Sequence, residues 1–364
     1  MSSCSTTSRP PALRRQALGN LAAWAGLCLL LLGAGPGRAE QMALPTELRE
    51  QPGAVVAPRA GLRPVGLGSD VPGHPAAPAS GIAVLYPDLG EPYREVFNAI
   101  IEGVAEQAGA PVWRYPLAPD QEVAGLQTRL RRGGTRVVIA LGRQGLKAAT
   151  TLDRDFPVVL GGVVAIPEGV RRHTGISLTP DPAVLFTHLK RLLPGVRRVI
   201  VVYNPQNNEW LLTLALAAAR AQGLELAAFE ARDTAAAARL YQSQITRAGS
   251  HDAVWLPQDT TTVDEGTILP LVLRQSWRYS VPVFSSSFAH VRKGVLFALY
   301  PDNRQLGRAL AQTALRLQAG EAVPPGMLPL QAVLTAINLR TASHLGLNLD
   351  YQQQRRFDFV FPEP

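Results

Sequence analysis

Apolar β-branched runs alternate with amphipathic segments along most of the chain, and residues 193–230 show the pattern most clearly. Val199–Val202 is an unbroken apolar run, typical of a strand that is buried on both faces of a parallel sheet. Asn204-Pro205 ends that strand, Asn207 is predicted as the N-cap of the following helix, and Leu224–Phe229 is predicted as the next strand. The pattern predicts a strand–helix–strand unit whose functional residues lie in the loops after the carboxyl ends of the strands.

The same alternation extends from residue 81 to about residue 339. Further strands are predicted at Ile82–Tyr86, Pro111–Tyr115, Thr135–Ala140, Phe156–Leu160, Ala253–Leu256, Val281–Phe284, Val295–Tyr300 and Gln331–Leu339. Further helices are predicted at Tyr93–Gln107, Gln121–Arg132, Leu146–Leu152, Asp181–Leu192, Thr234–Ala248, Val263–Trp277 and Arg304–Leu317. Alternating strands and helices indicate a doubly wound α/β fold. Two successive α/β halves predict two Rossmann-like lobes with an interlobe cleft, and such clefts usually take a small ligand.

The N-terminal segment has the pattern of an export signal. Arginines precede a largely apolar stretch at residues 18–33, and Gly37-Arg38-Ala39 offers small residues for cleavage after Ala39. We expect a periplasmic protein; an uncleaved membrane anchor is the alternative. Residues 40–80 are rich in Pro, Gly and Ala without apolar periodicity, which predicts a flexible leader.

Removing the signal changes the composition of the mature protein. Cys4 and Cys28, the only cysteines, both lie within residues 1–39, so we expect neither a disulfide nor thiol chemistry. The segment carries four arginines and no acid, so the net charge falls from +8 to 8 − 4 = +4. That charge, and tryptophans that form no stacking stripe, argue against a nucleic-acid partner.

The sequence offers little support for catalysis. The six histidines are scattered without metal-ligand spacing, and there is no G-x-S-x-G motif. Residues 142–145 form a G-x-x-G without a lysine in the place that a phosphate loop requires. We therefore expect no catalytic residues, no metal and no cofactor.

Five segments, in order, carry a family resemblance: ALGRQGLKAATTLDRDFPVVLGGVVAIPEG, HTGISLTPDPAVLFTHLKRLLPGVRRVIVVYNP, HDAVWLPQDTTTV, VPVFSSSFAHVRKGVLFALYPDNRQLGRALAQTALRLQAGE and INLRTASHLGLNL. Through them the chain resembles the substrate-binding proteins of ABC transporters with the type I periplasmic binding fold. It is most similar to the tryptophan- and tyrosine-type subfamily. The resemblance covers residues 81 to about 349.

The resemblance implies two lobes that close on a small-molecule solute and present it to an ABC permease. The first lobe would comprise 81–176 and about 300–325, the second 177–299 and about 326–350, with a tail at 351–364. Three hinge crossings are expected, near Gly175, Leu296–Tyr300 and Pro324–Leu334. We expect a monomer. The alternative hypothesis is an exported sensor or accessory protein that uses the same fold without transport.

Polar residues at the predicted strand exits are the candidate ligand-binding residues. They are Tyr86, Asp88, Gly142, Arg143 and Gln144 in the first lobe; Asn204, Asn207, Gln258, Asp259, Thr260, Ser285 and Ser286 in the second; and Tyr300 and Asp302 beside a hinge. The helix that opens at Gly142, with Arg143, is suited to a carboxylate, and Asp259 to an ammonium group. Asp88, Asn207 and Asp302 are equally suited to capping helices, whereas Asp259 is the best candidate for a ligand contact, with capping of the next helix as its alternative.

The chain departs from the subfamily pattern at two of these places. Ser or Thr with Pro often stands where this chain has Arg143-Gln144, and an acid follows the serine where this chain has Ser286-Ser287. An added arginine and a missing acid change the charge of the expected pocket. The resemblance therefore leaves an anionic or less amine-dependent solute as an alternative to an aromatic amino acid.

Overall fold

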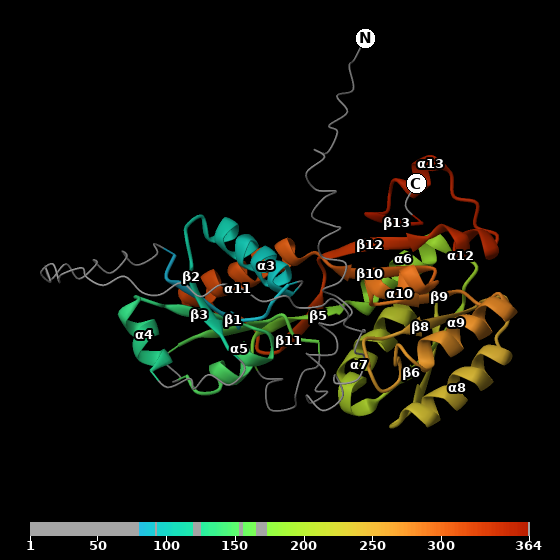
Figure 1. The fold of residues 1–364 in the computed structure, drawn as a ribbon, viewed down its shortest axis with the longest axis horizontal. Coiled ribbons are helices and arrows are strands. Elements are labelled where there is room, and N and C mark those ends of the chain that lie inside the picture. The colour runs from blue at the N-terminus through green and yellow to red at the C-terminus, as the bar shows by residue number, and fades with distance from the viewer. Residues whose placement is uncertain (1–79, 92, 119–124, 153–155, 165–172, 363–364) are drawn as a thin grey trace, which may run out of the picture.

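In a computed structural model of the protein, the chain forms two α/β lobes that lie side by side (Figure 1). The structure describes residues 80–91, 93–118, 125–152, 156–164 and 173–362. The predicted signal, 1–39, and all of the predicted leader except Ser80 lie outside them. The helices of the described part are too short or too polar to span a bilayer. The predicted α/β class, with two doubly wound lobes, is confirmed.

The first sheet holds six parallel strands in the order β11-β5-β4-β3-β1-β2. These are β1 (Ile82–Pro87), β2 (Trp113–Leu117), β3 (Val137–Leu141), β4 (Val158–Gly161), β5 (Gly175–Pro180) and β11 (Met327–Leu330). Its helices are α3 (Tyr93–Ala108), α4 (Leu126–Arg132), α5 (Gly142–Ala149) and α11 (Asn303–Gln318). Because side chains alternate along a strand, Ile82 and Val84 pack against α3 and α11, while Ala83 and Leu85 pack on the opposite face with α4 and α5.

The second sheet has seven strands in the order β13-β12-β10-β9-β8-β6-β7. These are β6 (Arg198–Tyr203), β7 (Glu225–Glu230), β8 (Asp252–Leu256), β9 (Val283–Ser285), β10 (Phe297–Pro301), β12 (Val333–Asn338) and β13 (Phe359–Phe361). The strands from β7 to β10 are parallel, and β12 runs antiparallel to β10. The helices are α6 (Pro182–Leu192), α7 (Pro205–Ala221), α8 (Thr234–Thr246), α9 (Ile268–Tyr279), α10 (Phe288–Lys293), α12 (Leu339–His344) and α13 (Tyr351–Gln354).

The predicted apolar run of β6 shows why both faces of this sheet are covered. Val199 and Val201 pack in a cluster with α6 and α7. Ile200 and Val202 point the other way and pack with α8 and α9. Because both faces are buried, the polar groups of this lobe that are open to a ligand concentrate where the strands end. The side of a sheet at which its parallel strands have their carboxyl ends is called its carboxyl edge below.

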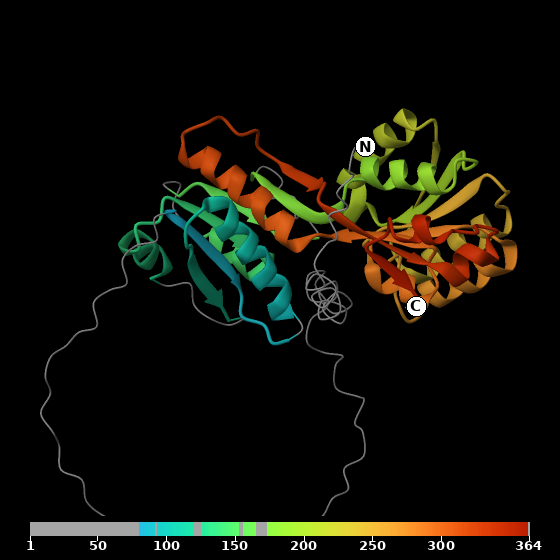
Figure 2. The ribbon, with the colours of Figure 1, turned by 90° about the horizontal axis from the view of Figure 1, so that it is seen from above.

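Three segments pass from one sheet to the other: β5 into α6, β10 into α11, and β11 into β12. They run together between the lobes (Figure 2) and are tied by main-chain hydrogen bonds. Asp181 N donates to Leu330 O at 2.9 Å, and Asp302 N donates to Ala332 O at 3.0 Å. The Gln331 amide also donates to the Asp181 carboxylate. The connection between the lobes is therefore narrow and internally hydrogen-bonded.

Two predicted crossings differ in position from the structure. The first was expected near Gly175, but that residue opens β5 within the first sheet, and the chain leaves the sheet after Pro180. The second was expected at 296–300, of which 297–300 lie within β10, and the crossing follows Pro301. Residues 327–330, expected in the second lobe, form β11 and pair with β5 in the first sheet.

Several predicted elements also differ in their bounds. The predicted cap of α7 was Asn207, but the helix begins at Pro205, and the Asn204 side chain accepts from Gln206 N. Proline suits the first helical position because the missing N–H has no intrahelical partner there. The helix predicted from Val263 begins at Ile268. The start of the helix predicted from residue 121 lies outside the described residues.

His188 makes the stability of the second lobe pH-dependent. Its ring lies 5.0 Å from the Phe297 ring and 5.6 Å from the Phe357 ring. Burial, and then the nearby Arg191 charge, lower the pKa of His188 to about 4, against the opposing effect of Asp358. The unfolded chain then binds more protons than the folded chain between pH 6.5 and about 4, so stability is lost as the pH falls through this window.

We expect the free energy of unfolding to fall by about 2 kcal/mol at pH 5 relative to pH 7.5 through His188 alone. The measurement is urea unfolding at both pH values for the wild type and for His188→Gln, which cannot titrate. The variant should lose about 2 kcal/mol less than the wild type on acidification. Equal losses in both proteins would contradict this role of His188.

Candidate functional site

The carboxyl edge of the second sheet is organised by Asp259, which follows β8 and is 3% exposed. Its carboxylate accepts hydrogen bonds from five N–H groups on two strand exits, and no cation contacts it in the described part of the chain. The donors are Asn204 N at 2.8 Å, Asn208 Nδ2 at 2.9 Å, Thr261 N at 2.9 Å, Asn207 Nδ2 at 3.3 Å and Thr262 N at 3.4 Å. Two of the predicted site residues, Asn204 and Asn207, therefore meet Asp259 directly. The carboxylate serves mainly to lock the β6 exit to the β8 exit.

Gln258 links this edge to the crossing between the lobes. Its Oε1 accepts a hydrogen bond from Thr179 Oγ1 at 3.2 Å, and Thr179 lies in β5 of the first sheet. Its Nε2 donates to the main-chain oxygen of Ser286 at 3.0 Å. Gln258 thus contacts both the chain that crosses between the lobes and the exit of β9. A movement of either segment would change the hydrogen bonds of the Gln258 amide.

Ser285, at the end of β9, lies 2.8 Å from His290 Nδ1, and His290 Nε2 lies 3.7 Å from Glu265 Oε1. The arrangement resembles a nucleophile with its base, but Ser285 is fully buried and its oxygen also accepts from Ser287 N at 3.0 Å. Burial lowers the pKa of His290 to about 4, although Glu265 opposes this. The buried Ser285 hydroxyl therefore holds the β9 exit in place through its hydrogen bonds.

The carboxyl edge of the first sheet presents the start of α5. Gly142 has φ +66°, and a Cβ there would lie 2.9 Å from Pro87 Cγ, so only glycine fits without strain. No side chain caps α5, because Leu141 stands at its N-cap. The free N–H groups of a helix N-terminus favour an anion. Arg143 is exposed and Gln144 partly buried in the first turn of the same helix.

The other predicted residues are more dispersed. Tyr86 is partly buried against the first core, Asp88 is exposed, and Thr260 is exposed beside Asp259. Asp302 caps α11 by accepting from Gln305 N at 3.0 Å. Tyr300 is buried against Phe288, with ring centroids 4.8 Å apart, and burial raises the pKa of its phenol. The structure therefore gathers Asn204, Asn207, Gln258, Asp259, Ser285 and Ser286 at one edge, and Gly142, Arg143 and Gln144 at the other.

Trp210 is a residue that the sequence analysis missed. It lies in α7 and packs against the second-lobe core and also against a first-lobe cluster that includes Ala140, Leu160 and Met327. Its indole Nε1 is buried and has no hydrogen-bond partner among the described residues. The sequence does offer one indication of this role. Trp210 lies five residues after Pro205, in the helix that follows a strand exit, and such helices border the ligand site in folds of this class.

A model of the family described as "ABC transporter substrate binding protein" matches residues 117–352, which is more than half of the chain. The chain belongs to this family. The match runs from the end of β2 into α13 and includes strands of both sheets. A comparison with curated proteins gives no match. The family supports a role in binding a substrate, and among the described residues no group of three or more His, Cys, Asp or Glu side chains is placed to hold a metal ion.

Two solved structures are similar to the chain. One is the ligand-free, open structure of a substrate binding protein with adhesive properties from Clostridium difficile, 14% identical with a TM-score of 0.56, covering 77% of this chain and 98% of that one. Another is the ABC domain in complex with L-Trp from Streptococcus pneumonia, 21% identical with a TM-score of 0.46, covering 77% of this chain and all of that one. At these identities the likeness concerns the fold alone, which is that of the type I periplasmic binding proteins.

Proposed function

We propose that this substrate-binding protein captures a small anionic solute between the carboxyl edges of its two sheets and delivers it to an ABC permease. The observation that carries the proposal is the placement of the polar strand exits. The α5 N-terminus belongs to one sheet and the Gln258–Asp259 network to the other, and three adjacent crossings connect the sheets. Export to the periplasm, with cleavage after Ala39, belongs to the same proposal.

The charges at the two edges favour an anion. Asp259 is buried and already accepts from five donors, so it offers no open acceptor to an ammonium group. The α5 N-terminus lacks a side-chain cap, and Arg143 is exposed in its first turn. A carboxylate would be bound by main-chain N–H groups and by the guanidinium. Asn207, which is partly buried, and Thr260, which is exposed, are neutral polar groups on the opposite edge that a solute can reach.

The lobes are proposed to close on the solute. Thr179–Gln258 and Trp210 already connect them, and the crossings are short. The solute shifts the population toward the closed form only by the difference between its contact free energies in the closed and open forms. A solute held from both edges makes contacts in the closed form that it cannot make with one lobe alone.

A thermal-shift screen of the purified protein tests the proposal, with amino acids, short peptides, organic acids, nucleosides and vitamins as the panel. A solute at 100 times its dissociation constant should add about 2.7 kcal/mol to the stability of the folded state. We expect hits among carboxylates, and at least a tenfold loss of affinity for them in Arg143→Gln, since a charge-assisted hydrogen bond contributes about 1.5–3 kcal/mol.

Arg132→Gln is the matched control, because Arg132 is exposed at the end of α4, away from the α5 N-terminus. It should leave the affinity unchanged. A panel in which only amines stabilise the protein, or in which Arg143→Gln and Arg132→Gln behave alike, would count against the anionic solute. No stabilisation by any solute would count against the receptor function itself.

A further inference from the structure

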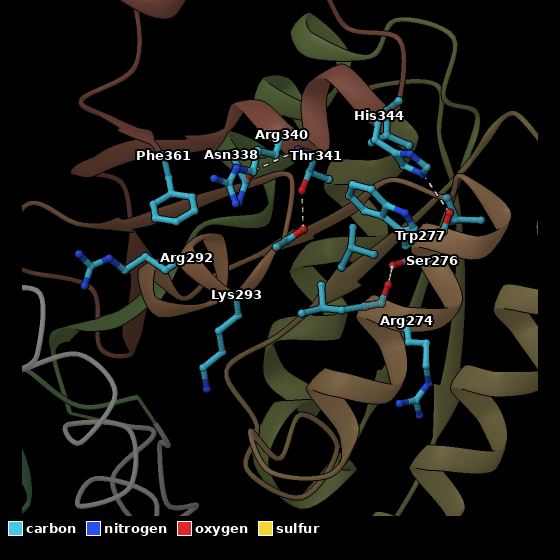
Figure 3. A pocket seen from close by; sticks show the side chains of 15 residues that line it. Arg274, Ser276, Trp277, Arg292, Lys293, Asn338, Arg340, Thr341, His344 and Phe361 are labelled. Carbon is cyan, nitrogen blue, oxygen red and sulfur yellow. Dashed lines mark hydrogen bonds between the residues drawn. The ribbon is translucent and has the colours of Figure 1, made fainter. Parts of the chain in front are cut away.

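A hollow lies in the second lobe, between α9, α10 and α12 (Figure 3). Its volume is about 420 Å³. Leu273, Val281, Val283, Leu345 and Phe361 provide its apolar lining. On one side Trp277 stacks on His344, with ring centroids 3.7 Å apart and an angle of 7° between the planes, and Trp277 is 51% exposed. A large aromatic surface is thus open to solvent beside an apolar floor.

This hollow is not part of the site between the lobes. It adjoins Val283, the first residue of β9, whereas Ser285 and the Asp259 network lie where the parallel strands end. Asn338, the last residue of the antiparallel β12, lies at the same end as Val283. Figure 1 shows α9 and α12 on the side of the second lobe away from the first lobe. A molecule in the hollow would not touch the carboxyl edges.

The lining carries four cations, Arg274, Arg292, Lys293 and Arg340, and no Asp or Glu. Among the described residues, only Lys293 of these four has an ion pair, with Glu265 at 2.7 Å. Figure 3 shows Arg292, Lys293 and Arg274 extending outward around the hollow. Its neutral polar groups are already paired within the protein: Asn338 Nδ2 donates to Val291 O, and Thr341 Oγ1 donates to Gly294 O, each at 2.8 Å.

A ring of arginines is commonly no more than a solvated surface. Here the cations border an apolar hollow that also contains an exposed, stacked indole. A cluster of solvated arginines alone would have no apolar hollow and no exposed indole beside it. A volume of about 420 Å³ lies within the range of small-molecule sites, which combine an apolar lining with a few polar or charged groups that fix orientation. Arginine pairs with both oxygens of a carboxylate or phosphate.

We propose that this hollow is a second binding site, for a small amphipathic organic anion. Its carboxylate or phosphate is held at the rim of the hollow by Arg292 and Arg340, and its flat apolar body lies against the apolar floor and reaches the Trp277–His344 stack. The site has its own ligand, independent of the solute between the lobes. Binding there leaves the crossings and the Gln258 contact untouched.

The test is isothermal titration of the full protein with 1-naphthyl phosphate, compared with 1-naphthol and with inorganic phosphate. We expect one naphthyl phosphate per chain, and binding at least tenfold weaker for each of the two comparison compounds. Arg292→Gln combined with Arg340→Gln should weaken naphthyl phosphate at least tenfold, and so should Trp277→Ala. The arginine pair lies at the surface, so this variant keeps the test valid if Trp277→Ala fails to fold.

Arg239→Gln is the matched control, since Arg239 is exposed on α8, outside the hollow, and it should bind like the wild type. Arg143→Gln should also bind naphthyl phosphate normally, which separates this site from the one between the lobes. Loss of binding in Arg143→Gln, equal binding by the arginine pair variant and the wild type, or more than one naphthyl phosphate per chain would overturn the proposal. Binding to phosphatidylglycerol vesicles without binding of naphthyl phosphate would overturn it too, in favour of a membrane contact.

Discussion

Asp259→Ala is expected to destabilise the ligand-free protein by about 4 kcal/mol and to abolish solute binding. The carboxylate is buried, and five N–H groups from the β6 and β8 exits donate to it. Each buried donor left without an acceptor costs about 1–3 kcal/mol, and water entering the space would satisfy only some of them. Urea unfolding and hydrogen exchange of residues 204–208 and 259–263 measure the effect.

Asp233→Ala is the matched control, because Asp233 also accepts from a main-chain N–H, that of Ala236 at 2.7 Å, but caps α8 at the surface. Loss of such a cap costs about 1 kcal/mol. Asp259→Asn keeps one acceptor oxygen and should fall between the two. If Asp259→Ala were as stable as the wild type and lost only the binding of amines, the carboxylate would be a ligand group, as the sequence hypothesis had it.

The fold could be predicted from sequence because its signals are local. The run at 199–202 and the helix periods in α3 and α11 need no knowledge of distant residues. β11 was missed because Met327–Leu330 is short and contains a proline, so its strand character comes from pairing with β5. The cap of α7 was misplaced although Asn204-Pro205 offered the information, since proline at the first helical position is itself a start signal.

The candidate site was harder to predict because its contacts join distant residues. The sequence identified the strand exits, and the structure places Asn204, Gln258 and Asp259 at one sheet edge. The sequence does not reveal whether the Asp259 carboxylate faces a ligand or the protein. That orientation depends on contacts with residues such as Asn208, 51 positions from Asp259. Trp210 was missed for the same reason, because its role comes from packing against residues of the other lobe that are distant in sequence.

These contacts explain how the two departures from the subfamily pattern, at Arg143-Gln144 and at Ser286-Ser287, change the charge of the site. The acid that the resemblance led us to expect after the serines is absent, and Ser286 instead bonds through its main-chain oxygen to Gln258. Asp259, the buried acid that follows β8, is turned toward protein donors. Arg143 is exposed at the opposite edge. The two departures act in the same direction, toward a solute that brings negative charge.

The second large effect is expected in the first lobe, where α3 and α11 cross at two glycines. A Cβ added to Gly103 would lie 2.0 Å from Arg304 O, and one added to Gly307 would lie 2.0 Å from Ile100 O. Both obstacles are main-chain atoms, so the helices must separate. Alanine is favoured over glycine in a helix by about 1 kcal/mol, but overpacking of this kind costs about 3 kcal/mol or more, so the clash wins.

Gly307→Ala should therefore lower the free energy of unfolding by at least about 2 kcal/mol and raise hydrogen exchange in residues 93–108 and 303–318, leaving β6–β8 protected. Gly195→Ala is the control, because nothing lies within 4 Å of a Cβ there. Gly103→Ala should have a similar effect, and the double variant should lose less than the sum of the two, since helices separated by one methyl group accommodate the second. Additive losses would show that the two contacts are independent, and an unchanged stability in Gly307→Ala would show that the crossing is looser than 2.0 Å implies.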